Sequence, residues 1–513
     1  MKTLISGLVF FTLWIMTIPL YAQHANNPLL YSYQAVQFSD QQISHDPVTL
    51  VMPGTAYASG FGSFLDNPAS AALFENSFGS FGMAFRDNRE ESSFLGNRVQ
   101  SDNGQIALSN LGFLYHLPTS RGKMVMGAGY SQHSFYNRAL EISGRNTETT
   151  ITDEFKMPWS DYREIGFSTY ATDYGDEFED WDESIFRVGF DQYGHYLGIH
   201  QEGEILQHGF GGEFSGFFAT EFQRNLMVGI SVGIKSGRSA YDRTFLEIDR
   251  DGDYNSEFID TNEDGEGNTD IDRILLVDEV SSEFLALQVR GGAIYRLNDH
   301  LNIGASYTLP ARMTVDETFD ARVATTFDNG VSFEDDVRGE FTYRVHSPHR
   351  IGVGLSLTDI GGWTASLGAE YADYGKTAVE FDSDNFEAER LENDFISDTY
   401  TDVWNLRAGL AYDLGGSVTL RGGYAHYPSR FRNLDLDKNH YSAGAGFKLN
   451  QNTRLEIAAQ YTTWKEDAVV YNYGAYDYSS LPDAAPVISE QSELSLTDVA
   501  RLQLMATLRF SLY

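Results

Sequence analysis

The chain has 513 residues, a formal net charge of −37 and no cysteine. This charge excludes a protein that binds nucleic acid through its phosphates, because such binding needs a basic surface. The missing cysteine excludes a disulfide scaffold, a zinc–thiolate site, a cysteine nucleophile and a lipidated-cysteine anchor.

The N-terminus, residues 1–22, has the composition of a secretory signal peptide. Lys2 supplies a positive charge, Leu4–Leu20 form an apolar core, and Ala22 offers a small residue for cleavage. An uncleaved membrane anchor is the alternative. No later segment is apolar over about 18 residues, so we expect no membrane helix in the mature chain. Such a chain belongs to the periplasm, the exterior or the outer membrane.

Residues 23–77 alternate poorly between apolar and polar positions. They are too many for a simple periplasmic tail ahead of the strands that follow. We therefore predict that residues 23–77 form an N-terminal plug, or hatch, inside the structure that those strands build.

From Phe78 onward, apolar residues alternate with small or polar ones over stretches of about ten residues, a period typical of β-strands with different surroundings on their two faces. In Leu226–Ser236, for example, five apolar side chains fall on one face and small or polar residues on the other. The fourteen predicted strands are Phe78–Arg86, Ala107–Leu117, Lys123–Asn137, Gly212–Gln223, Leu226–Tyr241, Glu283–Leu297, Leu301–Val315, Phe341–Leu357, Trp363–Glu380, Tyr400–Asp413, Ser417–Tyr427, His440–Lys448, Arg454–Glu466 and Thr497–Tyr513.

The connections between these strands are alternately short and long. The short ones contain Gly, Asn, Asp and Ser, the residues of tight hairpins. The longest are residues 138–211, 242–282 and 467–496. This alternation is typical of bacterial outer-membrane barrels, which have short periplasmic turns and long outer loops. Residues 78–513 are therefore predicted to be a 14-stranded antiparallel transmembrane β-barrel in the outer membrane of a Gram-negative bacterium.

The segment Gly62–Leu73 contains the run Asn67-Pro68-Ala69. It resembles the N-terminal hatch of the FadL/TodX outer-membrane transport family, and Leu30–Ser32 with Gly54–Phe64 resembles the Bacteroidota branch. The resemblance implies a non-enzymatic barrel with a hatch in its lumen and passive uptake of hydrophobic molecules, such as long-chain fatty acids or aromatic hydrocarbons. Its other partners would be membrane lipid, lipopolysaccharide and, during biogenesis, the barrel-assembly machinery.

The resemblance also implies a kinked third strand that serves as a lateral exit. Gly127 and Gly129 lie in that strand, and a glycine within a strand often marks a bulge or a bend. The alternative is that both glycines leave room for the hatch.

One acidic segment is a candidate calcium-binding loop. Asp260, Asn262 and Asp264 are followed by Gly265, which resembles the start of such a loop, although Ile271 occupies its twelfth position and excludes an EF-hand. The alternative is a solvated acidic loop, and we expect no other cofactor. The candidate ligands are Asp249, Asp251, Asp253, Asp260, Asn262, Asp264, Glu266, Asp270 and Asp272.

Two further functions remain open. One is a FadL-like barrel component of a protein secretion or surface-assembly system, which gene neighbours would distinguish from a transporter. The other is an outer-membrane lipid hydrolase. Gly229–Gly233 matches a nucleophile-elbow pattern, but the alternation continues through it, whereas that motif needs a strand, a sharp turn and a helix. We therefore interpret the match as chance.

Overall fold

A computed structural model describes residues 30–41, 46–156, 160, 162–174, 182–186, 197–257, 259–262, 264–381, 386–474, 489–491 and 494–512. The predicted signal peptide lies outside these residues. Among the helices of the described part, none has the length and hydropathy needed to cross a membrane.

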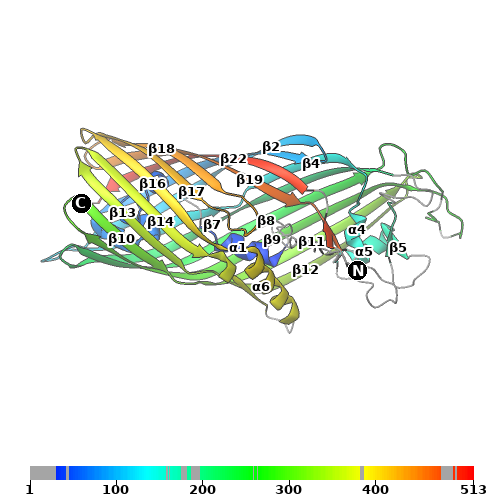
Figure 1. Cartoon of the computed structure of the whole chain (residues 1–513), viewed down its shortest axis with the longest axis horizontal. Coiled ribbons are helices and arrows are strands. Elements are labelled where there is room, and N and C mark those ends of the chain that lie inside the picture. Colours follow the sequence, from blue (N-terminus) through cyan, green and yellow to red (C-terminus); the bar gives the residue numbers. More distant parts are fainter. Residues whose placement is uncertain are drawn as a thin grey trace, which may run out of the picture.

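The strands form one closed antiparallel barrel, because the last strand pairs with the first from Phe78↔Ser511 to Ser93↔Leu496. Figure 1 shows the strands running along the long axis of the molecule. The barrel strands are β1 (Phe78–Phe94), β2 (Asn97–His116), β3 (Met124–Phe135), β4 (Arg138–Asn146), β7 (Ile199–Gln223), β8 (Leu226–Ile248), β9 (Ile271–Arg296), β10 (Leu301–Thr308), β11 (Arg312–Phe327), β12 (Ser332–His346), β13 (Arg350–Ile360), β14 (Trp363–Asp373), β15 (Ala378–Phe381), β16 (Asp402–Leu414), β17 (Val418–Tyr427), β18 (Lys438–Lys448), β19 (Thr453–Val469) and β22 (Leu494–Ser511).

Four positions of the barrel are each shared by two of these strands, namely β3 with β4, β10 with β11, β12 with β13 and β14 with β15. β3 and β4 both pair with β7, for example, and β10 and β11 both pair with β9. The fourteen predicted strands therefore each fall on one position of the barrel, and the predicted fold is confirmed.

The remaining elements lie in the N-terminal segment and the long connections. The helices are α1 (Tyr31–Ser39), α2 (Pro47–Val51), α3 (Ser63–Asp66), η3 (Pro68–Leu73), α4 (Thr152–Phe155), α5 (Arg163–Ser168), η4 (Tyr374–Lys376) and α6 (Phe386–Thr399). Two small sheets pair β5 (Thr172–Tyr174) with β6 (Asp182–Ser184), and β20 (Asn472–Gly474) with β21 (Ser489–Gln491).

Several predicted strand ends were wrong on the side of the long loops. β9 begins at Ile271 rather than at Glu283, and β1 and β2 continue to a hairpin turn at Leu95 and Gly96. Both turn residues have positive φ, 48° and 80°, as a tight two-residue hairpin needs. The added parts of β1 and β2 are rich in charged and polar residues, and the added part of β9 contains the consecutive apolar run Ile274–Val277. Neither composition shows a clear period of two in the sequence.

The outer wall presents apolar side chains, as predicted. On β8, Ile230, Val232 and Ile234 are exposed, whereas Ser231 and Lys235 between and beside them are buried. A barrel with this arrangement is wetted by lipid outside and is polar inside.

Aromatic pairs mark both edges of this apolar band. The rings of Tyr371 and Trp404 are 5.3 Å apart near one edge, and those of Trp363 and Tyr412 are 4.6 Å apart near the other. Such girdles lie at the two membrane interfaces of outer-membrane barrels. The long loops therefore begin just beyond the first girdle.

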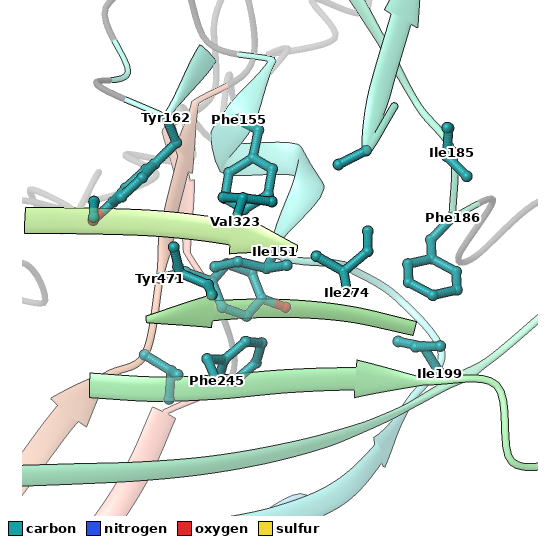
Figure 2. Packing of buried hydrophobic residues seen from close by; sticks show 14 of the residues in the cluster. Ile151, Phe155, Tyr162, Ile185, Phe186, Ile199, Phe245, Ile274, Val323 and Tyr471 are labelled. Carbon is teal, nitrogen blue, oxygen red and sulfur yellow. The ribbon is translucent and has the colours of Figure 1, made fainter. Parts of the chain in front are cut away.

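The far end of the barrel, beyond that girdle, is filled by a hydrophobic cluster. Ile151 and Phe155 of the long connection after β4 pack with Phe245 of β8, Ile274 of β9 and Val323 of β11 (Figure 2). This cluster covers the end of the lumen opposite the short turns.

The N-terminal segment lies among the inward-facing side chains of the strands, and Figure 1 shows α1 surrounded by barrel strands. Within it, Asp46 caps α2 by accepting hydrogen bonds from the backbone N–H groups of Val48 and Thr49, at 2.9 and 3.1 Å. Pro47 occupies the first helical position, where its missing N–H costs nothing. We call described residues 30–41 and 46–77 the hatch. β1 begins directly after it, at Phe78.

Candidate functional site

The Asn67-Pro68-Ala69 run fastens the hatch to the barrel wall. Asn67 is fully buried, and its side-chain oxygen accepts a hydrogen bond from the Ala69 N–H at 3.0 Å. Its Nδ2 donates to Thr55 O at 2.7 Å, within the hatch, and to Ala293 O on β9 and Ala305 O on β10, both at 3.2 Å. One amide thus joins the hatch to two strands.

Seven inward-facing glycines let the hatch backbone approach the wall closely. A Cβ at Gly292 would lie 1.9 Å from Asn67 Oδ1, and one at Gly304 would lie 2.0 Å from Thr55 O. Only hydrogen fits at such distances. We call this set the glycine belt, and it consists of Gly229, Gly292, Gly304, Gly354, Gly368, Gly409 and Gly423.

The glycine belt also accounts for Gly229 in the Gly229–Gly233 pattern. It lies in the middle of β8, where the ladder with β9 is regular, and no strand-to-helix turn follows Ser231. Gly229 instead leaves room for Pro68 of the hatch, whose carbonyl carbon would be 2.5 Å from an added Cβ. The belt was missed in the sequence because glycine is common throughout the chain, and only the fold shows which glycines face the hatch.

Inward-facing cations of the wall bind the hatch as well. Arg407 of β16 pairs with Asp66 at 3.1 Å, and Arg350 of β13 donates to Ser39 O at 2.8 Å. Lys235 of β8 donates to Phe38 O at 2.5 Å. Burying these cations in the lumen is tolerable because each is hydrogen-bonded.

The third strand is interrupted beside the end of α1. Its ladder with β2 ends at Asn110↔Ser131, and its register with β7 shifts between Gln132 and Ser134. Tyr136 and Asn137 belong to neither β3 nor β4. We call residues 132–137 the strand-3 break.

Beyond the strand-3 break, the chain turns toward the lumen. Carbonyl groups of Asn137 and of β4 accept hydrogen bonds from side chains of β1 and β2, including those of Asn88, Ser92 and Ser101. These side chains are buried on the inner face of the wall. Side-chain hydrogen bonds thus replace the backbone ladder here. In the described chain, the part of β2 from Asn97 to Ser109 has no ladder partner on the edge that faces β3 and β4.

The glycines predicted to kink this strand lie before the break. Gly127 pairs with Leu114 and Phe217, and Gly129 pairs with Gly112 and Ser215, all in an unbroken ladder. An added Cβ at Gly129 would lie 2.7 Å from the Phe61 ring of the hatch. Gly129 therefore makes room for the hatch, and the use of this region as a lateral exit stays a prediction.

The hatch touches the strand-3 break directly. Ser134 Oγ donates to Asp40 O at 3.1 Å, and the rings of Phe38 and Tyr136 are 5.8 Å apart. Movement of the hatch would therefore change the packing of the break.

Several of the predicted calcium ligands are engaged in other contacts. Asp251 and Asp253 pair with Arg145 at 2.7 and 2.9 Å, and this contact lowers the pKa of Asp251. Asp260 accepts a hydrogen bond from the Gly265 N–H at 2.7 Å. The other predicted ligands are Asp249, Asn262, Asp264, Glu266, Asp270 and Asp272. Among described residues, no three His, Cys, Asp or Glu side chains form a group that could hold a metal ion.

Calcium binding stays a prediction, and calorimetric titration of the protein tests it. If the loop binds calcium, heat is expected at millimolar calcium, the concentration range of extracellular sites. The Asp260→Asn variant should lose that heat, whereas a wild-type titration without heat would remove the hypothesis.

Docking of α6 on the hatch should depend on pH. Glu392 of α6 accepts a hydrogen bond from the Ser32 N–H of α1 at 2.9 Å, and burial raises the pKa of Glu392. A raised pKa in the docked state means that the protonated carboxyl is favoured there, so docking weakens as the pH rises through that pKa. We expect the backbone amides of α1 to exchange hydrogen faster at neutral pH than at mildly acidic pH, after correction for the intrinsic exchange rate at each pH.

The Glu392→Gln variant should lose this pH dependence, whereas Asp394→Asn, at an exposed position paired with Arg390, should keep it. An unchanged pH profile in Glu392→Gln would contradict the assignment.

Comparisons with known proteins agree with this architecture. Residues 213–487 match the family described as "Outer membrane protein transport protein (OMPP1/FadL/TodX)". The crystal structure of the P. putida toluene transporter TodX has a TM-score of 0.50 at 12% identity, covering 92% of this chain and 99% of that one. The TodX monoaromatic hydrocarbon channel deltaS2 mutant gives 0.51 at 13%, with the same coverage. At these identities the structures show the fold alone. No curated protein matches the sequence.

Proposed function

The chain belongs to the outer membrane protein transport family (OMPP1/FadL/TodX), and on that premise we propose that it carries hydrophobic molecules into the cell by passive diffusion. The molecules would be of the long-chain fatty acid or aromatic hydrocarbon type. The protein resides in the outer membrane of a Gram-negative bacterium, as its family and its barrel fold indicate.

The observation that supports this proposal is the position of the strand-3 break. It interrupts the wall next to the hatch end, where Asp40 and Phe38 contact Ser134 and Tyr136. A water-filled pore does not favour an apolar solute, because the free energy of such a solute falls only when it leaves water. A hatch-filled barrel with an interrupted wall can instead pass that solute sideways into the lipid.

The proposed route begins at the outer end of the lumen and ends at the opening in the wall. The solute would enter past the buried hydrophobic cluster around Phe155 and Phe245, whose apolar side chains would part to admit it. It would leave through the strand-3 break when the hatch shifts. Passive movement follows the concentration gradient of the solute, so no energy source and no catalytic group are required. We accordingly propose that the protein is not an enzyme.

Other partners are proposed from the same position in the membrane. Lipid would cover the apolar band, and lipopolysaccharide would surround the strand extensions with their charged side chains. The barrel-assembly machinery would act during biogenesis.

Uptake into cells tests the proposed function. The protein should be expressed in a Gram-negative host that lacks its own channels for fatty acids and hydrocarbons. Entry of radiolabelled oleate or toluene should rise about tenfold over the empty host, while entry of a labelled sugar should not change. No increase for either apolar probe would contradict the proposal and would favour a secretion role instead.

A further inference from the structure

The barrel wall changes height between β18 and β19. The ladder between them ends at Asn439↔Thr463, and β18 begins at Lys438, whereas β19 continues to Val469. In the described part of the chain, no strand pairs with this outer part of β19 on the β18 side. The wall therefore has a step here, well away from the strand-3 break, with β22, β1 and β2 between the two places.

Trp464 lies at this step. Its side chain points inward with those of Gln460 and Thr462, and it is 8% exposed. Its Nε1 donates to Glu466 Oε1 at 2.7 Å, and Lys438 Nζ lies 4.9 Å from its ring centroid. The indole is thus held where the next strand is missing.

Trp464 lines two separate spaces. Inside the lumen, it borders a cavity of about 50 Å³ together with Tyr33, Arg430 and Lys438. Outside, it borders a groove of about 600 Å³ together with Tyr461, several charged residues of the neighbouring strands, and Asp435 and Asp437 of the connection between β17 and β18. Trp464 is therefore a residue common to the linings of the inner cavity and the outer groove.

The groove opens just beyond the outer aromatic girdle. Tyr461 is in register with Tyr441, which pairs with Tyr424, and all three side chains are exposed on the lipid side. Trp464 follows Tyr461 by three residues, about 10 Å along the strand away from the apolar band. This places the groove at the level of the lipid head groups.

The inner cavity has balanced charges. Arg430 and Lys438 line it together with Asp40 and Glu466, and the hydroxyl-bearing rings of Tyr33 and others complete its wall. Such a lining can donate hydrogen bonds to a neutral polar group of a ligand and can accept hydrogen bonds from it. A charged group of a ligand would instead be repelled by the residues of its own sign.

We infer that the step between β18 and β19 is a side entrance from the head-group layer into the lumen, closed by the indole of Trp464. It admits molecules with an aromatic or aliphatic body and one neutral polar end, such as a phenol or a fatty alcohol. The apolar body of the molecule takes the place of the indole at the step, and its polar end reaches the charged inner cavity. This inference rests on the proposed transport function and adds an entrance and a substrate class to it.

The test is thiol labelling of the full chain in liposomes of phosphatidylcholine and lipopolysaccharide. The protein contains no cysteine, so Val403→Cys, which replaces a buried side chain lining the inner cavity, supplies a unique thiol. The probe is a pyrene maleimide dissolved in the bilayer. Trp464→Ala should raise the labelling rate about tenfold, since removal of a gating side chain removes most of the barrier.

Trp404→Ala is the matched control, because Trp404 belongs to the same girdle but faces lipid. It should leave the rate unchanged, and Trp464→Phe, which keeps a ring, should stay near wild type. Equal labelling in Trp464→Ala and wild type would overturn the inference. So would an equal acceleration with a sulfonated maleimide added from the water, because the opening would then face solvent.

The substrate class is tested on Trp464→Ala by competition. 1-Dodecanol should slow labelling about threefold more than dodecane does, because only the alcohol can form hydrogen bonds in the cavity. Equal slowing would overturn the class. Labelling needs no transport, so a Trp464-dependent rate without oleate or toluene uptake would contradict the proposed function alone, and uptake with a Trp464-independent rate would contradict the entrance alone.

Discussion

Replacing Gly292 with alanine should push the hatch off the wall and turn a closed barrel into one that conducts ions. The new methyl would lie 1.9 Å from Asn67 Oδ1 and 2.8 Å from its Cγ. Asn67 cannot retreat without losing its bonds to Ala293 O and Ala305 O, which would remain buried. Losing them should destabilise the seated hatch by about 2–4 kcal/mol. Single-channel conductance in planar bilayers measures the outcome.

Gly291→Ala is the matched control. Gly291 is the next residue on β9, and nothing lies within 4 Å of a Cβ added to it. This variant should stay as closed as the wild type. A silent Gly292→Ala barrel that is correctly folded, or equal conductance in both variants, would contradict the placement of the hatch.

Removing Arg290 alone should destabilise the barrel strongly. Its guanidinium forms two bonds with Glu213, at 2.6 and 2.7 Å, and the two side chains are 1% and 0% exposed. Arg290→Met leaves the carboxylate buried without its counter-ion, which costs about 3–5 kcal/mol. The free energy of unfolding in urea, followed by tryptophan fluorescence in detergent micelles, should fall by that amount.

Two comparisons isolate the cause of this loss. The double variant Arg290→Met/Glu213→Met should recover much of the stability, because it removes the buried charge as well. Arg98→Met breaks an exposed pair with Glu91 and should cost less than about 1 kcal/mol. An additive double variant would show that the two buried side chains do not interact.

The barrel itself was predictable from the sequence because its signal is local. Alternation with a period of two identifies a strand without knowledge of its partners, and Ile230, Val232 and Ile234 do face outward as predicted. The short and long connections then fix the topology. The Asn67 run was recognisable for the same reason, since it is contiguous.

The features that the sequence did not predict depend on contacts between residues far apart in the chain. The strand-3 break at Tyr136 and Asn137 was not predicted from the sequence. Its cause is that inner-face side chains of β1 and β2, such as Ser92, form hydrogen bonds with β4 in place of a backbone ladder. The partnership of Glu213 with Arg290 likewise requires knowledge that β7 and β9 both flank β8.

The glycine belt shows how the hatch and wall specify each other. Gly304 and Gly354 are neighbours in register, and both face Thr55 of the hatch. No pattern within either strand distinguishes them from glycines that face lipid, such as Gly291. The close approach that they permit positions the hatch more narrowly than hydrophobic burial alone would.

A single engineered disulfide tests the seating of the hatch most directly. An ideal Cβ at Gly368 lies 3.0 Å from Pro53 Cβ, close to the separation of about 3.8 Å in disulfides. In a chain without cysteine, Pro53→Cys/Gly368→Cys should form an intramolecular bridge in intact outer membranes and show a reductant-sensitive gel shift. Pro53→Cys paired with Gly422→Cys, whose position faces lipid, should form none. Absence of the first bridge, or equal formation of both, would contradict a hatch seated against the inner wall.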